Sequence, residues 1–143
     1  MERNQMSDAD VAALLSRIRF CRIAPHITQY YLGDGWALHR HTAPDTSPPH
    51  DHPHTLESRV LGDDHLPEHA RGVSGGYTEE VFEQRPSTGA WEARTEHHAV
   101  GEEFGFVAEH VHRVVALDRA ESWTLVRFGK DEVPWRHYPE ALA

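Results

Sequence analysis

The stretch Pro49-His50-Asp51-His52-Pro53-His54-Thr55-Leu56-Glu57 carries the strongest structural signal in the chain. In an extended backbone every second side chain points to the same face, so His50 and His52 would present two imidazoles to one side. A carboxylate, Glu57, follows shortly after. Two imidazoles with a nearby carboxylate supply half of a transition-metal site, and a strand is the element that presents them in this way.

Histidine is so abundant in this chain that the pair has to be weighed against chance. The sequence has 13 His among 143 residues, and random placement would give roughly one His-x-His pair. The chain has four such pairs, namely His39/His41, His50/His52, His52/His54 and His110/His112. A pair alone is therefore weak evidence, and the pair at His50 stands out because of its surroundings.

Composition limits the class of protein. A length of 143 residues is usual for one domain. The formal charge of −9 argues against nucleic acid or an anionic membrane as partner, because both require a basic patch. A single cysteine excludes an internal disulfide. Neither a signal peptide nor an apolar run near the roughly 20 residues of a membrane span is evident. We therefore expect a soluble cytoplasmic protein.

The N-terminal pattern predicts one short amphipathic helix. Ser7-Asp-Ala-Asp10 is a helix start signal, and apolar residues follow at helical spacing, at Val11, Leu14, Leu15 and Ile18. We expect this helix to end between Arg19 and Ile23. The expected organisation is an N-terminal segment, residues 1–24, packed on a single barrel domain formed by residues 25–143.

Beyond Pro25 the pattern changes to short strands separated by turn residues. The expected strands are residues 26–32, 36–41, 55–61, 77–84, 90–96, 105–108, 112–117 and 123–128. Residues 62–73 fit neither period and are expected to form a loop. Many short strands with turns at such intervals are typical of an all-β antiparallel sandwich or barrel.

The sequence resembles the cupins, small jelly-roll barrels also described as a double-stranded β-helix. The first cupin motif, Gly-x5-His-x-His-x3,4-Glu-x6-Gly, is similar to His50-x-His52-x4-Glu57, although Pro44 stands at its leading glycine and its trailing glycine is displaced. The second motif, Gly-x5-Pro-x-Gly-x2-His-x3-Asn, retains Gly101 and His112 at the right separation. Its proline, second glycine and asparagine are replaced.

A further resemblance is to uncharacterised bacterial cupins in which four short stretches follow one another in a fixed order. The corresponding stretches here are residues 50–53 (His-Asp-His-Pro), 75–77 (Gly-Gly-Tyr), 112–114 (His-Arg-Val) and 123–125 (Trp-Thr-Leu). The resemblance implies a cupin barrel with a short N-terminal helix. Similar barrels often pair, so it also implies a homodimer.

The resemblance implies a metal site made of His50, His52, His112 and Glu57. Two imidazoles from one strand and a third from a distant strand would leave open positions on a divalent metal. Strict alternation places Glu57 on the opposite face from His52, so its inclusion requires a bulge near Pro53. His110 has the same parity as His112 and is the rival third histidine.

Other residues are candidates for catalysis or substrate binding. His54, His98 and His110 are candidates for proton transfer near the metal. The candidates for substrate binding are Arg40 and Arg59, which could hold a carboxylate bidentately, and Tyr77 and Trp123, which could line a pocket. The alternatives are solvated arginines, packed aromatic rings and surface histidines.

The expected function is that of a mononuclear metal-dependent enzyme acting on a small organic substrate. Fe(II) is the favoured cofactor, with Mn, Ni, Co or Zn as alternatives, and an Fe(II)-dependent oxygenase is the first hypothesis. A non-redox isomerase, cyclase or lyase is the second. A non-catalytic cupin that binds or senses a small molecule is the third.

Overall fold

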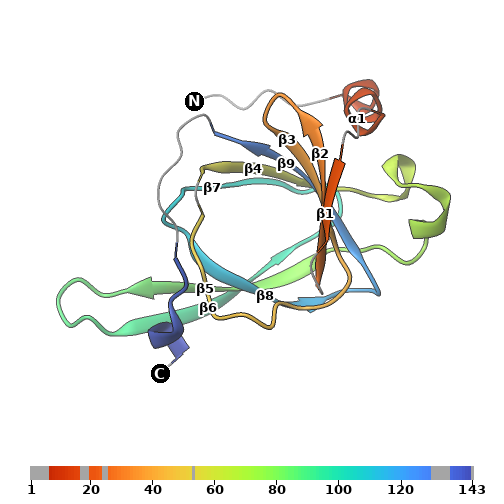
Figure 1. Ribbon diagram of the computed structural model, residues 1–143. Helices are drawn as coiled ribbons and strands as arrows, with labels where there is room; N and C mark the ends of the chain where they lie inside the picture. The colour runs from red at the N-terminus through yellow and green to blue at the C-terminus, as the bar shows by residue number, and fades with distance from the viewer. Residues whose placement is uncertain (1–6, 17–19, 24–25, 53, 130–135, 143) are drawn as a thin grey trace.

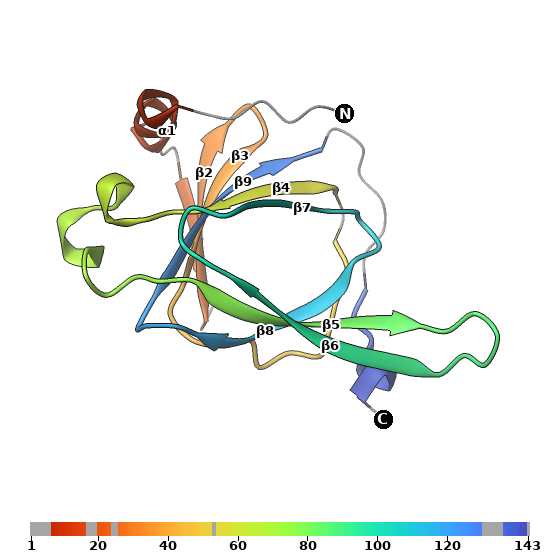
Figure 2. The same ribbon diagram turned by 180° about the vertical axis from the view of Figure 1, so that it is seen from behind.

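The computed structural model describes residues 7–16, 20–23, 26–52, 54–129 and 136–142 (Figure 1). These residues form two antiparallel sheets that lie face to face, as both views show (Figures 1 and 2). The six-stranded sheet has the order β1-β2-β3-β9-β4-β7, and the three-stranded sheet has the order β6-β5-β8. The strands are β1 (Phe20–Ile23), β2 (Ile27–Gly33), β3 (Trp36–His41), β4 (Leu56–Val60), β5 (Tyr77–Gln84), β6 (Trp91–His98), β7 (Glu103–Phe106), β8 (Val111–Leu117) and β9 (Ser122–Phe128).

The expected all-β architecture is confirmed, and eight of these strands lie within a few residues of their predicted positions. The ninth, β1, occupies residues among which the helix is expected to end. Helix α1 spans Asp8–Leu15, shorter than expected, and starts with a capping box in which Ser7 Oγ accepts a hydrogen bond from the Asp10 N–H. The prediction that the helix ends as late as residues 20–23 is wrong, because the helix ends at Leu15. Phe20–Ile23 instead pair antiparallel with β2, which gives their backbone groups partners in the sheet.

One apolar cluster lies on the outer side of the six-stranded sheet. It contains Val11 and Leu14 of α1, Leu66 and Ala70 from the following long connection, and outward-facing strand residues, including Leu38, Trp123 and Leu125. The connection, residues 62–73, is not irregular throughout as expected, because it contains the 3-10 turns η1 (Asp63–His65) and η2 (Glu68–Ala70). Both faces of β9 are therefore covered, and Ser122–Val126 are all buried.

The inner faces of the two sheets carry many polar side chains. The inward-facing residues of β3 and β9 include His39, His41, Thr124 and Val126, whereas Leu38 and Trp123 face outward. A smaller apolar cluster formed by Val60, Tyr77 and Val114 occupies part of the interior. Since the outer apolar cluster buries much of the hydrophobic surface, the interior is left with polar groups and space around them.

Two further contacts fix the elements that border the interior. A Cβ atom at Gly76 would collide with the carbonyl oxygen of His98, so only glycine allows β5 and β6 to approach this closely. Near the C-terminus the 3-10 turn η3 (Pro139–Leu142) places Ala141 against Phe82 and Val111, on the outer face of the three-stranded sheet. Both sheets are therefore covered on at least part of their outer faces.

Candidate metal centre

His50 and His52 lie on an extended segment that leads into β4, not on a regular strand as predicted. The backbone N–H of His50 donates to the His112 carbonyl at 3.0 Å, and the N–H of His52 donates to the Ala108 carbonyl at 2.9 Å. The N–H of Asp51, between them, donates in the other direction to Arg136. The alternation that motivated the prediction is therefore present, because these bonds to neighbouring segments keep the backbone extended.

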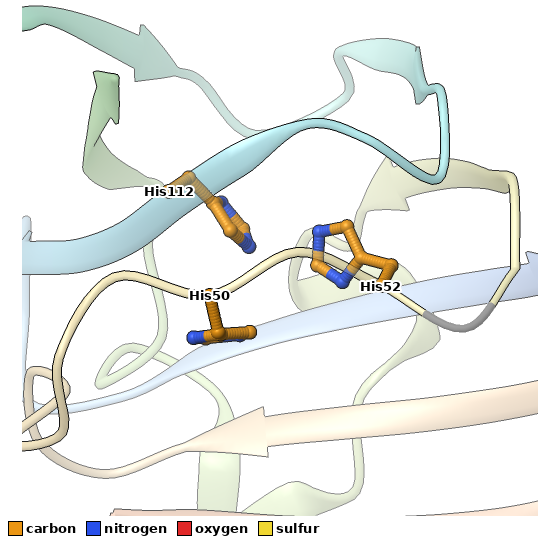
Figure 3. Close-up of side chains that lie close together, drawn as sticks. All are labelled: His50, His52 and His112. Carbon is orange, nitrogen blue, oxygen red and sulfur yellow. The ribbon is translucent and has the colours of Figure 1, made fainter. Parts of the chain in front are cut away.

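The expected third histidine, His112, lies beside this pair on β8 (Figure 3). The His112 ring centroid is 5.2 Å from that of His50 and 4.6 Å from that of His52. One ring nitrogen from each of the three residues falls within a mutual distance of 4.8 Å, which is compatible with ligation of one ion. The structure thus brings together the three histidines that the sequence analysis predicts as ligands, although His52 and His112 are 60 positions apart in the sequence.

Burial keeps the imidazoles of His50 and His52 neutral. It is the main cause that lowers the pKa of His52 to about 2 and that of His50 to about 4, with further lowering from neighbouring His112. A metal-binding imidazole must be deprotonated, so these shifts favour ligation. The Nε2 atom of His52 is buried and has no hydrogen-bond partner among the described residues. An orphan imidazole nitrogen beside two other imidazoles fits a borderline-soft divalent metal.

Glu57 is not part of this cluster, contrary to the expectation of a fourth ligand. β4 pairs regularly with β7 and β9 from Leu56 to Arg59, so Leu56 and Ser58 face the interior and Glu57 faces away. The bulge that would have turned the carboxylate inward was expected at Pro53, which lies outside the described residues. The described part of β4 keeps strict alternation.

A carboxylate that the sequence reasoning missed, Glu79 on β5, lies beneath the histidines and is 0% exposed. Its Oε1 is 2.8 Å from His110 Nε2, and its Oε2 is 3.4 Å from His112 Nδ1 and 3.2 Å from His98 Nε2. Burial alone would raise the pKa of Glu79, but hydrogen bonds from His110 and His112 outweigh it and hold the pKa far below its usual value. Glu79 is therefore ionised.

His98 on β6 also lies in this layer of polar groups behind the three histidines and contacts Glu79. Its Nδ1 is 2.5 Å from Glu102 Oε2, and its ring stacks on Phe104 with centroids 3.8 Å apart. Burial lowers the pKa of His98, but the two carboxylates, Glu79 and Glu102, outweigh burial and raise it. The imidazole of a metal-ligating histidine usually donates its other N–H to a carboxylate, and Glu79 occupies that position for His112.

The three histidines border a cavity of about 990 Å³ between the sheets. Of the predicted proton-transfer residues, His54 lines this cavity, whereas His98 and His110 lie behind it and contact Glu79. Of the predicted substrate-binding residues only Tyr77 lines it, 5% exposed, with its ring 5.1 Å from that of His98. Burial raises the pKa of Tyr77, so its hydroxyl stays protonated.

The other predicted substrate-binding residues lie outside the cavity. Trp123 is 3% exposed in the outer cluster, stacks on Tyr30 and donates through Nε1 to Glu121. Arg40 pairs with Glu121 and lies over the Trp123 ring. Arg59 lies 3.7 Å from Asp8 of helix α1. These three side chains face outward because their strand neighbours occupy the interior.

The fold of this chain is similar to the folds of several solved structures. No protein-family model matches the chain, and no curated protein matches it. Among solved structures, the polyketide cyclase RemF from Streptomyces resistomycificus matches with a TM-score of 0.53 and 19% identity, covering 96% of this chain and 84% of that one. The Bacillus subtilis oxalate decarboxylase, a protein with Mn(II) centres, matches with a TM-score of 0.56 and 18% identity.

The match to oxalate decarboxylase covers 87% of this chain and 30% of that one, so this chain spans less than a third of that enzyme's length. At 18% and 19% identity these similarities show the fold alone. The chain has the fold of the cupin superfamily, as its two histidine motifs implied. No helix among the described residues has the length and apolar character that crossing a bilayer requires.

Proposed function

We propose that this chain is a mononuclear metal-dependent enzyme that transforms a small organic molecule inside the cavity between its sheets. The observation that carries the proposal is the convergence of His50, His52 and His112 on one point of the cavity wall. The cavity volume of about 990 Å³ is at the upper end of the range of small-molecule sites. Three protein ligands on one side leave room for substrate on the other.

Each residue of the site has a separate task in this proposal. His50, His52 and His112 hold the ion, and Glu79 orients the His112 ring from behind through Nδ1. When bound, a divalent metal supplies Lewis-acid or redox chemistry to a substrate oxygen. His54, which lines the cavity next to Phe128, takes and returns a proton at its imidazole nitrogen. Tyr77 contributes part of the cavity wall.

Two reaction classes fit these parts. Oxygen-dependent oxidation with Fe(II) is the first, because three neutral ligands leave positions for both substrate and a second reactant. Non-redox cyclisation, isomerisation or lyase chemistry is the second. It is favoured by the likeness to RemF, a polyketide cyclase, over most of both chains and by the presence of a cavity histidine for proton transfer.

Metal loading followed by oxygen measurement separates the two classes. Protein loaded anaerobically with Fe(II), Mn(II) or Zn(II) is mixed with a panel of phenols and cyclic ketones, and oxygen uptake and product formation are followed. Uptake that depends on both Fe(II) and a substrate supports the oxygenase. Product formation with Zn(II) and no oxygen uptake supports non-redox chemistry. If none of these three ions binds at His50 and His52, both reaction classes are contradicted.

A further inference from the structure

A second set of polar groups lines the cavity without contributing to the metal cluster. Gln29, His39 and Thr124 are direct partners across three neighbouring strands, β2, β3 and β9. Residues paired in register point to the same face of a sheet, and all three line the cavity. His41 follows on the same face of β3 and lies 6.2 Å from the Tyr77 ring, measured between centroids.

Two members of the row formed by Gln29, His39 and Thr124 have hydrogen-bonding capacity that the described residues do not use, whereas Oε1 of Gln29 already accepts a hydrogen bond from the Tyr31 hydroxyl at 2.9 Å. The Nε2 atom of His39 and the Oγ1 atom of Thr124 are buried and have no hydrogen-bond partner among the described residues. Thr124 is 4% exposed. A buried polar group without a partner costs free energy, so a native structure that keeps two of them side by side usually satisfies them with a ligand or ordered water. Neither belongs to a candidate metal group among the described residues.

The charge of the cavity restricts which ligand can satisfy these atoms. Arg127 is the only arginine or lysine among the described residues that line it, and Arg127 is exposed. Burial, with a smaller contribution from neighbouring His41, lowers the pKa of His39 to about 3, so the row is uncharged. Asp45 and Asp51 also border the cavity. An anionic molecule would thus find no buried arginine or lysine among the described residues of the wall, whereas a neutral one would meet donors and acceptors.

The remaining wall is apolar and partly aromatic. Leu56, Phe106, Val126 and Phe128 all line the same cavity as the polar row. The flat rings and branched side chains suit a planar or ring-shaped apolar body, because such a body gains most from burying its faces. Polar atoms confined to one row then select the position of its oxygen substituents.

We propose that Gln29, His39 and Thr124 form a hydrogen-bonding subsite that binds hydroxyl or carbonyl groups of a neutral, ring-containing substrate. The inference deepens the proposed function, since the other end of that molecule reaches the metal. His41 lies between the two regions, because it follows His39 on the inner face of β3 and lines the same cavity as His50 and His112. The subsite determines substrate class and the metal cluster determines chemistry.

The test compares three probes of similar ring shape, which are dihydroxynaphthalene, naphthalene and naphthalene disulfonate. Their dissociation constants are measured by fluorescence titration at about pH 7.5 with the metal-free protein and again after Zn(II) loading. Each neutral hydrogen bond contributes roughly a threefold to tenfold gain in affinity. We therefore expect the diol to bind about tenfold tighter than naphthalene, and the dianion to bind weakest to the metal-free protein.

Variants of the row assign the gain to its residues. Thr124→Val keeps the shape and β propensity of the side chain, and we expect it to weaken diol binding roughly threefold to tenfold and leave naphthalene binding unchanged. His39→Leu should do the same, and His39→Gln should restore part of the affinity. Thr28→Val is the matched control, because Thr28 lies on the same sheet at a position of opposite parity to Gln29.

The outcomes separate this inference from the proposed function. Equal diol affinities for Thr124→Val, Thr28→Val and the wild type would overturn the subsite, as would tighter binding of the disulfonate than of the diol to the metal-free protein. If the row governs diol binding but Zn(II) does not bind, the subsite stands and the enzymatic proposal fails. If Zn(II) binds at the three histidines and the row has no effect, the reverse holds.

Discussion

Replacement of Glu79 by glutamine tests whether the buried carboxylate supports the metal site. The amide keeps the size of the side chain but removes the charge that His98, His110 and His112 surround. An amide can donate to or accept from these rings, but it cannot accept from several N–H groups with the strength of a carboxylate. Mutation of a residue that hydrogen-bonds a metal-ligating side chain commonly weakens metal affinity by about 10- to 100-fold, or about 1.4–2.7 kcal/mol.

The assay is competition for Zn(II) between the protein and a chromophoric chelator, with circular dichroism to check that each variant is folded. Glu80→Gln is the matched control, because Glu80 is the next residue on β5 and its carboxylate pairs with Arg113 on the opposite face. Glu79→Asp keeps the charge with a shorter reach and should lie between wild type and Glu79→Gln. The reasoning is refuted if folded Glu79→Gln binds Zn(II) as tightly as the wild type, or if Glu80→Gln loses as much affinity.

Three further predictions concern the ligands, Glu57 and pH. His50→Ala, His52→Ala and His112→Ala should each lose most bound metal in elemental analysis, whereas His97→Ala, at an exposed position, should not; equal loss in all four would indicate nonspecific binding. Glu57→Gln should leave Zn(II) affinity unchanged, because β4 turns this side chain away from the cluster; a tenfold loss would mean that the segment rearranges when metal binds. In the folded state the pKa is about 4 for His41 and His50 and about 2 for His52, whereas the unfolded value is near 6.5. Below about pH 6.5 the unfolded chain therefore binds more protons than the folded chain does. The melting temperature of the metal-free protein should therefore fall from about pH 6.5 towards pH 4; the raised pKa of His98 acts in the opposite direction, and a flat profile over this window would contradict the dominance of the buried histidines.

The positions of the strands could be predicted from the sequence because the turn residues are strong signals. Gly33 and Gly35, with backbone φ of 88° and 81°, enclose the turn between β2 and β3, where Asp34 also has a positive φ. The end of the helix could not be predicted in this way. Residues 20–23 are as apolar as a helix end requires, and only their pairing with β2, a contact outside the local sequence, makes them a strand.

The histidines could be predicted and Glu79 could not, for a reason that lies in β5. Glu79 and Glu80 are chemically identical neighbours, and the sequence alone gives neither a partner. The signal that could have separated them is parity, because Glu79 lies on the same face of β5 as Tyr77 and Val81, which are both buried, whereas Glu80 lies on the other face and pairs with Arg113. An ionisable residue in phase with an apolar strand face is either a functional group or part of a buried network.

Parity also explains why Trp123 and Arg40, which the sequence suggests as substrate contacts, lie outside the cavity. On β9 Trp123 and Leu125 face α1 and residues 62–73, whereas Thr124, Val126 and Phe128 face the cavity. Alternation predicts two faces but not which of them is the interior. Here the assignment depends on which face the helix and the long connection cover, and that information is distant in sequence.

The most direct test of the metal centre is the metal content of the protein purified without added metal and then dialysed against one equivalent of Mn(II), Fe(II) or Zn(II). We predict one ion per chain for the wild type, held through imidazole nitrogens that X-ray absorption spectroscopy would detect as three nitrogen neighbours at about 2.0–2.1 Å for Zn(II). In the variant in which His50, His52 and His112 are all replaced by alanine, we predict less than one tenth of this content with the fold retained. Stoichiometric metal in that folded variant would contradict the assignment of the site.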